Sequence, residues 1–142
     1  MPLARIVFVL LYLVVDVIYV TLSRNAYESV VKRIQNKGFP GMSVSRLSAA
    51  AFAYISLAIG WMFLVAPVIE SEVKSQIDLI YVGGFYGAIY ALAVYGVFNG
   101  TLHVMFEQYD GKIMLRDMIW GLSCITIFSI LYAWYVLRLR QK

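Results

Sequence analysis

The chain has 142 residues, of which 62% are hydrophobic and 14% are charged, and its formal net charge is +4. Soluble domains are about 45–50% apolar and about 25% charged, so this composition excludes an ordinary soluble domain and predicts an integral membrane protein, built as one domain over residues 1–142. The positive charge suits connections that face anionic lipid headgroups, and no arginine-rich strip indicates a nucleic-acid partner.

Four apolar stretches predict four membrane-spanning helices, over residues 6–22, 47–69, 77–98 and 113–137. Each approaches the roughly 20 helical residues that cross a bilayer core. We interpret the first span as a mature helix and not a cleaved signal, because Asp16 interrupts its apolar stretch. Ser43 or Ser45 is the expected N-cap of the second span, and Pro67 marks the expected end of that span. The predicted fold is an all-α four-helix bundle.

The first connection, residues 23–46, is basic and has a helical pattern. Apolar side chains recur at the spacing of one helical face, and basic side chains lie between them: Tyr27, Val30, Val31, Ile34, Lys32 and Arg33. This pattern predicts a short basic amphipathic helix on the membrane surface. The alternative is a solvated segment that packs on its own protein.

Charge predicts the topology. Four spans place both termini on one side, here called face A, and the connections 23–46 and 99–112 on the other side, face B. Face B carries seven Lys and Arg residues and face A carries five. Basic connections tend to stay in the cytoplasm, so we expect connections 23–46 and 99–112 to be cytoplasmic.

Asp16 lies inside an apolar span. Inserting a carboxylate there costs about 2.5–3.5 kcal/mol of free energy on insertion scales, so a hydrogen-bonding partner or a functional role is expected. Counting from the helix ends places Asp16 about 9 Å below face B, at the depth of polar residues from spans three and four. We therefore predict one polar cluster from three helices, with His103 at the start of the third connection: Asp16, Tyr95, Asn99, His103, Asp117 and Trp120. Gly83, Gly87 and Gly121 are expected where helices pack closely.

Several roles remain open for these groups. Asp16 fits a structural lock between helices, a proton relay or transport site, or a ligand site. Asp117 also suits the positive end of a helix dipole. An Asp16–His103–Asp117 metal trio lacks the spacing of known zinc motifs, so no metal and no cofactor are predicted. Glu70, Glu72 and Asp78 are expected in a solvated acidic turn on face A.

The motifs Tyr95-Gly-Val-Phe-Asn99 and Asp117-Met-Ile-Trp120-Gly121 resemble the paired signatures of the domain-of-unknown-function 2177 family, small predicted four-helix membrane proteins of bacteria and large DNA viruses. Asp16, Tyr27 and Ala66-Pro67 also fit that pattern. The chain departs from it at Gly96, where the family often has an aspartate. The resemblance implies the fold and the membrane setting, and it implies no established activity.

Three function classes follow. The motifs of hydrolases, nucleotide-binding proteins and dinucleotide-binding enzymes are missing, so we predict a non-enzymatic protein that binds or passes a small solute or a proton, with a homo-oligomer or other membrane subunits as partners. The second class is a structural or accessory subunit of a larger membrane assembly or a virion membrane. The third is a lipid-acting enzyme that uses Asp16 and Asp117 as an acid/base pair.

Overall fold

The computed structural model describes residues 1–141, which form helices and connections without strands. Four helical segments are long and apolar enough to cross a membrane: Pro2–Leu22, Val44–Glu72, Leu79–Met105 and Gly111–Arg140. The first and last are the continuous helices α1 (Pro2–Leu22) and α7 (Gly111–Arg140). The four predicted spans of an all-helical membrane protein are therefore confirmed.

The two middle spans contain wide π-helical turns. The second span comprises α3 (Val44–Gly60), η1 (Trp61–Val65) and α4 (Ala66–Glu72). The third comprises η2 (Leu79–Gly84), α5 (Phe85–Ala91), η3 (Leu92–Gly96) and α6 (Val97–Met105). Ser43 is the N-cap of α3, where its hydroxyl accepts from the Arg46 amide at 3.4 Å.

The sequence predicts that the second span ends near Pro67. In the structure, the helix continues past Pro67 to Glu72. Proline lacks an amide donor, and its ring clashes with the carbonyl four residues earlier in a regular helix. The π-turn η1 ends at Val65, two residues before Pro67, and widens the helix there, which lets the span continue past the proline.

The third span is also longer than expected. Helix α6 runs to Met105, so Asn99 and His103 lie in a helix and not at the edge of a loop. The expected connection 99–112 shrinks to the few residues between α6 and α7. Polar residues had suggested the earlier end, but Asn99 is fully buried within the bundle, where its side chain finds partners.

The helix expected in the first connection is present as α2 (Arg24–Gln35), separated from α1 by Ser23 alone. Its apolar stripe packs against the protein: Val30 is 3% exposed, and Tyr27, Val31 and Ile34 are half-buried. Lys32 and Arg33 are exposed. The helix ends at Asn36, whose φ of 55° is left-handed.

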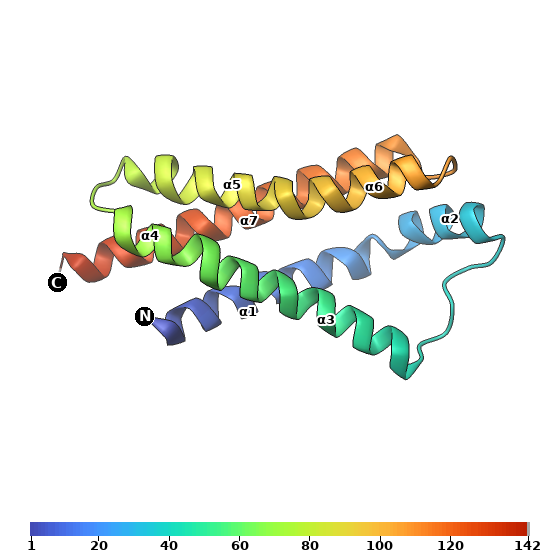
Figure 1. The fold of residues 1–142 in the computed structure, drawn as a ribbon, viewed down its shortest axis with the longest axis horizontal. Coiled ribbons are helices and arrows are strands. Elements are labelled where there is room, and N and C mark those ends of the chain that lie inside the picture. Colours follow the sequence, from blue (N-terminus) through green and yellow to red (C-terminus); the bar gives the residue numbers. More distant parts are fainter. Residues whose placement is uncertain (142) are drawn as a thin grey trace.

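Helix α7 forms the centre of the bundle and contacts α1, α4, α5 and α6. Figure 1 shows the third span running beside α7, while α3 crosses α1 and then diverges from the other helices. No residue of α3 is buried. A Cβ atom added at Gly83 would lie 2.8 Å from the Ala133 Cβ, and one at Gly87 would lie 2.6 Å from the Ser129 hydroxyl. Both glycines therefore lie where the third span approaches α7 closely.

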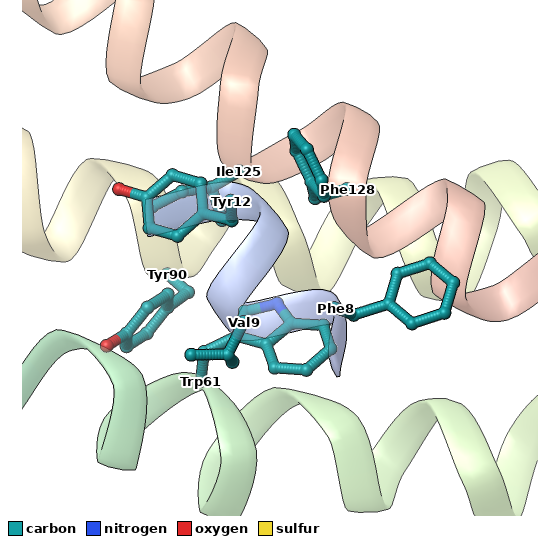
Figure 2. A pocket seen from close by; sticks show the side chains of 7 residues that line it. All are labelled: Phe8, Val9, Tyr12, Trp61, Tyr90, Ile125 and Phe128. Atoms are coloured by element: carbon teal, nitrogen blue, oxygen red, sulfur yellow. The ribbon is translucent and has the colours of Figure 1, made fainter. Parts of the chain in front are cut away.

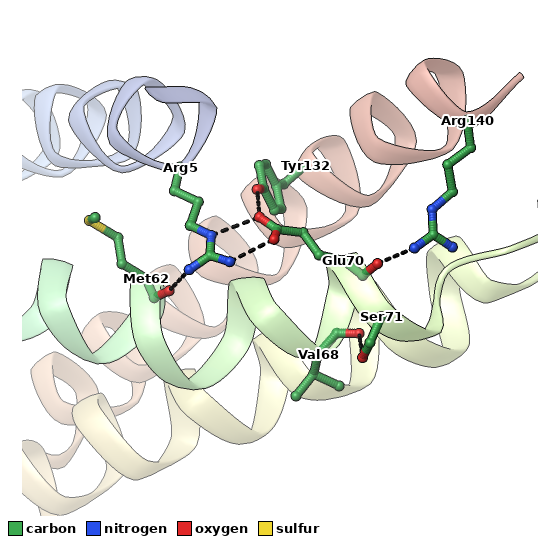
Figure 3. A network of polar contacts seen from close by, with 7 residues as sticks. All are labelled: Arg5, Met62, Val68, Glu70, Ser71, Tyr132 and Arg140. Atoms are coloured by element: carbon green, nitrogen blue, oxygen red, sulfur yellow. Dashed lines mark hydrogen bonds and ion pairs between the residues drawn. The ribbon is translucent and has the colours of Figure 1, made fainter. Parts of the chain in front are cut away.

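A second polar network joins three spans near face A (Figure 3). The Arg5 guanidinium donates to both Glu70 carboxylate oxygens, at 2.7 and 2.6 Å, and the Tyr132 hydroxyl also donates to Glu70. Arg140 donates to the backbone carbonyls of Glu70 and Val73. The expectation of a solvated acidic turn is therefore wrong for Glu70, whose side chain is only 19% exposed.

Candidate functional site

Asp16 is 5% exposed and accepts hydrogen bonds from three neutral donors on three other helical segments. Its Oδ1 accepts from the Tyr95 hydroxyl and the Trp120 indole N–H, both at 2.9 Å, and its Oδ2 accepts from the Tyr54 hydroxyl at 3.1 Å. Since the Tyr95 proton is directed at Asp16, the Tyr12 hydroxyl, 2.8 Å away, donates to Tyr95. Phenol and indole groups thus surround this carboxylate.

Asp117 is 7% exposed and has a separate set of donors. Its Oδ2 accepts from the Asn99 amide at 2.7 Å, and its Oδ1 accepts from the Tyr27 hydroxyl of α2. The Asn99 amide nitrogen also donates to the Tyr95 carbonyl at 3.0 Å, and the Asn99 oxygen accepts from the Tyr109 hydroxyl at 2.6 Å. Both amide hydrogens and the oxygen of Asn99 are therefore in use.

Tyr95 links the two carboxylates. Its hydroxyl donates to Asp16, and its carbonyl accepts from Asn99, which also donates to Asp117. We call the whole set the aspartate–tyrosine network, and its members come from all four spans, α2 and the connection before α7: Tyr12, Asp16, Tyr27, Tyr54, Tyr95, Asn99, Tyr109, Asp117 and Trp120.

The network contains two carboxylates and no cationic partner. The ion pairs within residues 1–141 join Arg5 to Glu70, Lys32 to Glu28 and Arg33 to Asp110, so neither Asp16 nor Asp117 has one there. No group of three His, Cys, Asp or Glu side chains in the described part of the chain is placed to hold a metal ion. The network can therefore form hydrogen bonds and attract positively charged groups.

Two phenols of the network lie outside the membrane spans, and both favour the protonated form. Burial, followed by the hydrogen bond to Asp117, raises the pKa of Tyr27 far above its ordinary value. Burial, followed by the charge of Asp117, raises the pKa of Tyr109 to about 12. Both hydroxyls therefore remain donors at neutral pH.

The network lies on the face B side of a tightly packed apolar layer. Figure 2 shows this layer, where the rings of Tyr12, Trp61, Tyr90 and Phe128 surround a small cavity. The cavity measures about 10 Å³, which is about the smallest space that holds one water molecule. This packed layer lies between the network and face A.

Five of the six predicted cluster residues lie in the network: Asp16, Tyr95, Asn99, Asp117 and Trp120. His103 does not. It is exposed in the last turn of α6, where its Nδ1 lies 3.0 Å from the Tyr109 carbonyl. Gly121 lies beside the network, because a Cβ atom there would come 2.2 Å from the Tyr95 ring.

The predicted cluster lacks four donors of the network: Tyr12, Tyr27, Tyr54 and Tyr109. Tyr54 gives no signal in the sequence, because it is one of eleven tyrosines in the chain and lies in an apolar span. Tyr109 lies in the short connection before α7. Tyr27 belongs to the apolar face of the predicted surface helix. That pattern does not predict a hydrogen bond from its hydroxyl to Asp117. An unpaired buried carboxylate is the signal that predicts such donors.

Comparison with known proteins adds a family. The model of a family described as "Predicted membrane protein (DUF2177)" matches residues 2–134, which is almost the whole chain and includes both aspartates and every donor of the network. Comparisons with curated proteins and with solved structures found no match. The match agrees with the four-span helical architecture, and the chain belongs to this family of predicted membrane proteins.

Proposed function

We propose that this protein binds a small positively charged species, a proton or a small organic cation, at the Asp16 and Asp117 carboxylates and passes it across the membrane. The observation that carries the proposal is that both carboxylates are buried with neutral donors only. Ionisable groups inside membrane helices pair with one another or lie on ion and substrate pathways. These two have no cationic side chain as partner within residues 1–141.

The aromatic surroundings of Asp16 favour the same ligand class. The Tyr19 and Trp120 rings stack at 4.1 Å between centroids, and the Trp120 indole donates to Asp16. The faces of aromatic rings attract cations, and the Arg116 guanidinium already lies over the Tyr19 ring, 5.6 Å from its centroid. The packed apolar layer toward face A supports a site approached from face B, and passage to face A requires this layer to open.

Reconstituted vesicles carrying a pH-sensitive dye inside test the proposal. We expect Asp16→Asn to abolish proton uptake, or the uptake of a small amine that competes with protons. Glu107→Gln is the matched control, because Glu107 is an exposed carboxylate in the connection before α7. Equal uptake by Asp16→Asn and the wild type would refute the proposal.

Tyr54→Phe separates binding from a structural lock. It keeps the Asp16 charge and removes one of three donors, which favours the protonated carboxyl. We expect the pH midpoint of uptake to move upward, together with the fall in melting temperature that the loss of one hydrogen bond to a buried carboxylate causes. If Asp16 only locks the helices, Tyr54→Phe changes stability and leaves the pH profile where it was.

A structural role in a larger membrane assembly is the second candidate. The observation that favours it is α3, which has no buried residue over its 17 positions and diverges from the bundle (Figure 1). Partner subunits would cover such a helix. In that case Asp16→Asn weakens assembly and leaves vesicle uptake unaffected.

A further inference from the structure

Few contacts hold α2 to the bundle. The Tyr27 hydroxyl donates to Asp117, and Val30 is the single buried residue of the helix. The Arg33 guanidinium lies 3.5 Å from the Asp110 carboxylate, and both side chains are partly exposed. Pairs of that kind contribute little and weaken as salt rises. The hydrogen bond from Tyr27 to Asp117 is therefore the contact that links α2 to the aspartate–tyrosine network.

The face that α2 uses to pack on the bundle is also the face that an interfacial helix inserts into a membrane. Tyr27, Val30, Val31 and Ile34 form that stripe, and the rest of the helix is mainly polar with three basic residues, Arg24, Lys32 and Arg33. Glu28, the only acid in α2, pairs with Lys32 at 3.0 Å. An amphipathic basic helix binds anionic membranes through the same stripe and its flanking charges. The bundle and the membrane surface therefore compete for one face of α2.

The segments that flank α2 allow it to change position. Ser23 alone separates α2 from α1, and its buried hydroxyl accepts a hydrogen bond from Arg116, so the helix pivots at Ser23 and this bond breaks when it moves. On the other side, residues 36–43 form no helix and include Gly38 and Gly41. Phe39 and Met42 in this segment are 45% and 84% exposed, which suits the boundary between headgroups and acyl chains. Figure 1 shows this segment as a long strap between α2 and α3.

We propose that α2 is a docking surface for anionic lipid headgroups, and that its transfer from the bundle to the membrane removes Tyr27 from Asp117. The transfer exposes the Asp117 carboxylate on face B. Its consequence for ligand binding rests on the proposed function, whereas the transfer itself does not. A ligand shifts such an equilibrium by its different affinity for the two states, and here the anionic surface favours the released helix.

Distance measurements between two spin labels test the transfer. The labels are placed at Ser29→Cys on α2 and Gln108→Cys in the connection before α7, both exposed positions, after the native Cys124 is replaced by alanine. We expect one short distance in phosphatidylcholine nanodiscs and a second, longer population when phosphatidylglycerol is included. An unchanged distance distribution would overturn the proposal.

Two variants sharpen the result. The double variant Arg24→Gln with Lys37→Gln removes two exposed positive charges around α2, and we expect the longer-distance population to disappear. The double variant Lys74→Gln with Arg138→Gln removes two exposed positive charges at face A, and we expect the longer-distance population to remain. Tyr27→Phe should enlarge the longer population, because it removes one docked contact. Equal responses of the two charge variants, or no gain with Tyr27→Phe, would contradict the proposal. A lipid-driven shift together with normal uptake by Asp16→Asn would remove the proposed function and leave this inference intact.

Discussion

At the scale of single residues, neutral donors explain how Asp16 remains inside an apolar bundle. A carboxylate at that depth costs about 2.5–3.5 kcal/mol on insertion scales, and a hydrogen bond to a charged group contributes about 1.5–3 kcal/mol. Three such bonds, from Tyr54, Tyr95 and Trp120, offset the cost without Lys or Arg. No Lys or Arg side chain within residues 1–141 therefore competes with a ligand for Asp16.

Gly121 controls this arrangement through the Tyr95 ring. A Cβ atom at Gly121 would lie 2.2–2.5 Å from three ring atoms, so Gly121→Ala forces the ring to move away from its position beside Asp16. We expect Gly121→Ala to destabilise the protein by about 1–3 kcal/mol, as overpacking does, and to lower ligand binding. Unfolding in mixed detergent micelles measures the first effect and vesicle uptake measures the second.

Gly100→Ala is the control for that substitution. Gly100 also lies within a helix, α6, but no atom lies within 4 Å of its added Cβ. Alanine there should be neutral or should stabilise the helix by up to about 1 kcal/mol. Equal destabilisation by the two substitutions would show that the Tyr95 contact is not the cause.

The residues of the network could be predicted only in part. Asp16 stands out by its charge, and depth counting places Tyr95, Asn99, Asp117 and Trp120 near it. Tyr54 could not be found in this way, because it starts deeper in its span and reaches Asp16 through a long side chain. Tyr109 depends on the path of a short connection, which no periodic pattern in the sequence describes.

At the scale of elements, the sequence predicts where helices exist better than where they end. Polar residues after Phe98 suggested a loop, yet Asn99 directs its amide at the Tyr95 carbonyl one turn earlier and at Asp117 on the neighbouring helix. A polar residue with such partners does not end a helix. The same reason explains why Glu70 is not in a solvated turn. Its partners, Arg5 and Tyr132, lie more than 60 residues away in the sequence.

The Arg5–Glu70 pair should hold α1 and the second span together at face A. Glu70→Gln removes the charge that accepts two bonds from Arg5 and one from Tyr132. We expect a loss of about 1.5–3 kcal/mol of stability, because hydrogen bonds to a charged group have that value and both side chains are mostly buried. Unfolding measurements in detergent test this.

Glu72→Gln is the matched control for Glu70→Gln. Glu72 lies two residues along the same helix, but it is exposed, and surface substitutions usually stay within about 0.5 kcal/mol. A loss as large with Glu72→Gln as with Glu70→Gln would mean that general charge, and not the specific pair, stabilises this end of the bundle.

At the scale of the whole molecule, hydropathy alone predicts the architecture, because a bilayer accepts only elements that satisfy their own backbone hydrogen bonds. Four apolar stretches therefore had to be four helices, and they are. Hydropathy does not predict how the helices associate. The central position of α7 and the divergence of α3 depend on side-chain packing between segments far apart in the chain.

The orientation in the membrane is a prediction for the whole molecule. Seven of the twelve Lys and Arg residues belong to face B, so we expect face B to be cytoplasmic. Ser75→Cys lies between the second and third spans on face A, and Gln108→Cys lies on face B; both positions are exposed. A membrane-impermeant maleimide added to intact cells should label Ser75→Cys and spare Gln108→Cys. The opposite labelling would reverse the orientation.

The wide turns of the third span have a consequence for reading sequences. Gly83, Gly87, Ala91, Tyr95 and Asn99 recur every four residues, a step that drifts by about 40° at each repeat on a regular helix with 3.6 residues per turn. Four of these residues are nevertheless buried, and the fifth, Tyr95, reaches Asp16. The wide turns η2 and η3 underwind the helix and so reduce this drift. A four-residue period kept over five positions of an apolar segment is thus a pattern beside which wide turns can be sought before any coordinates exist.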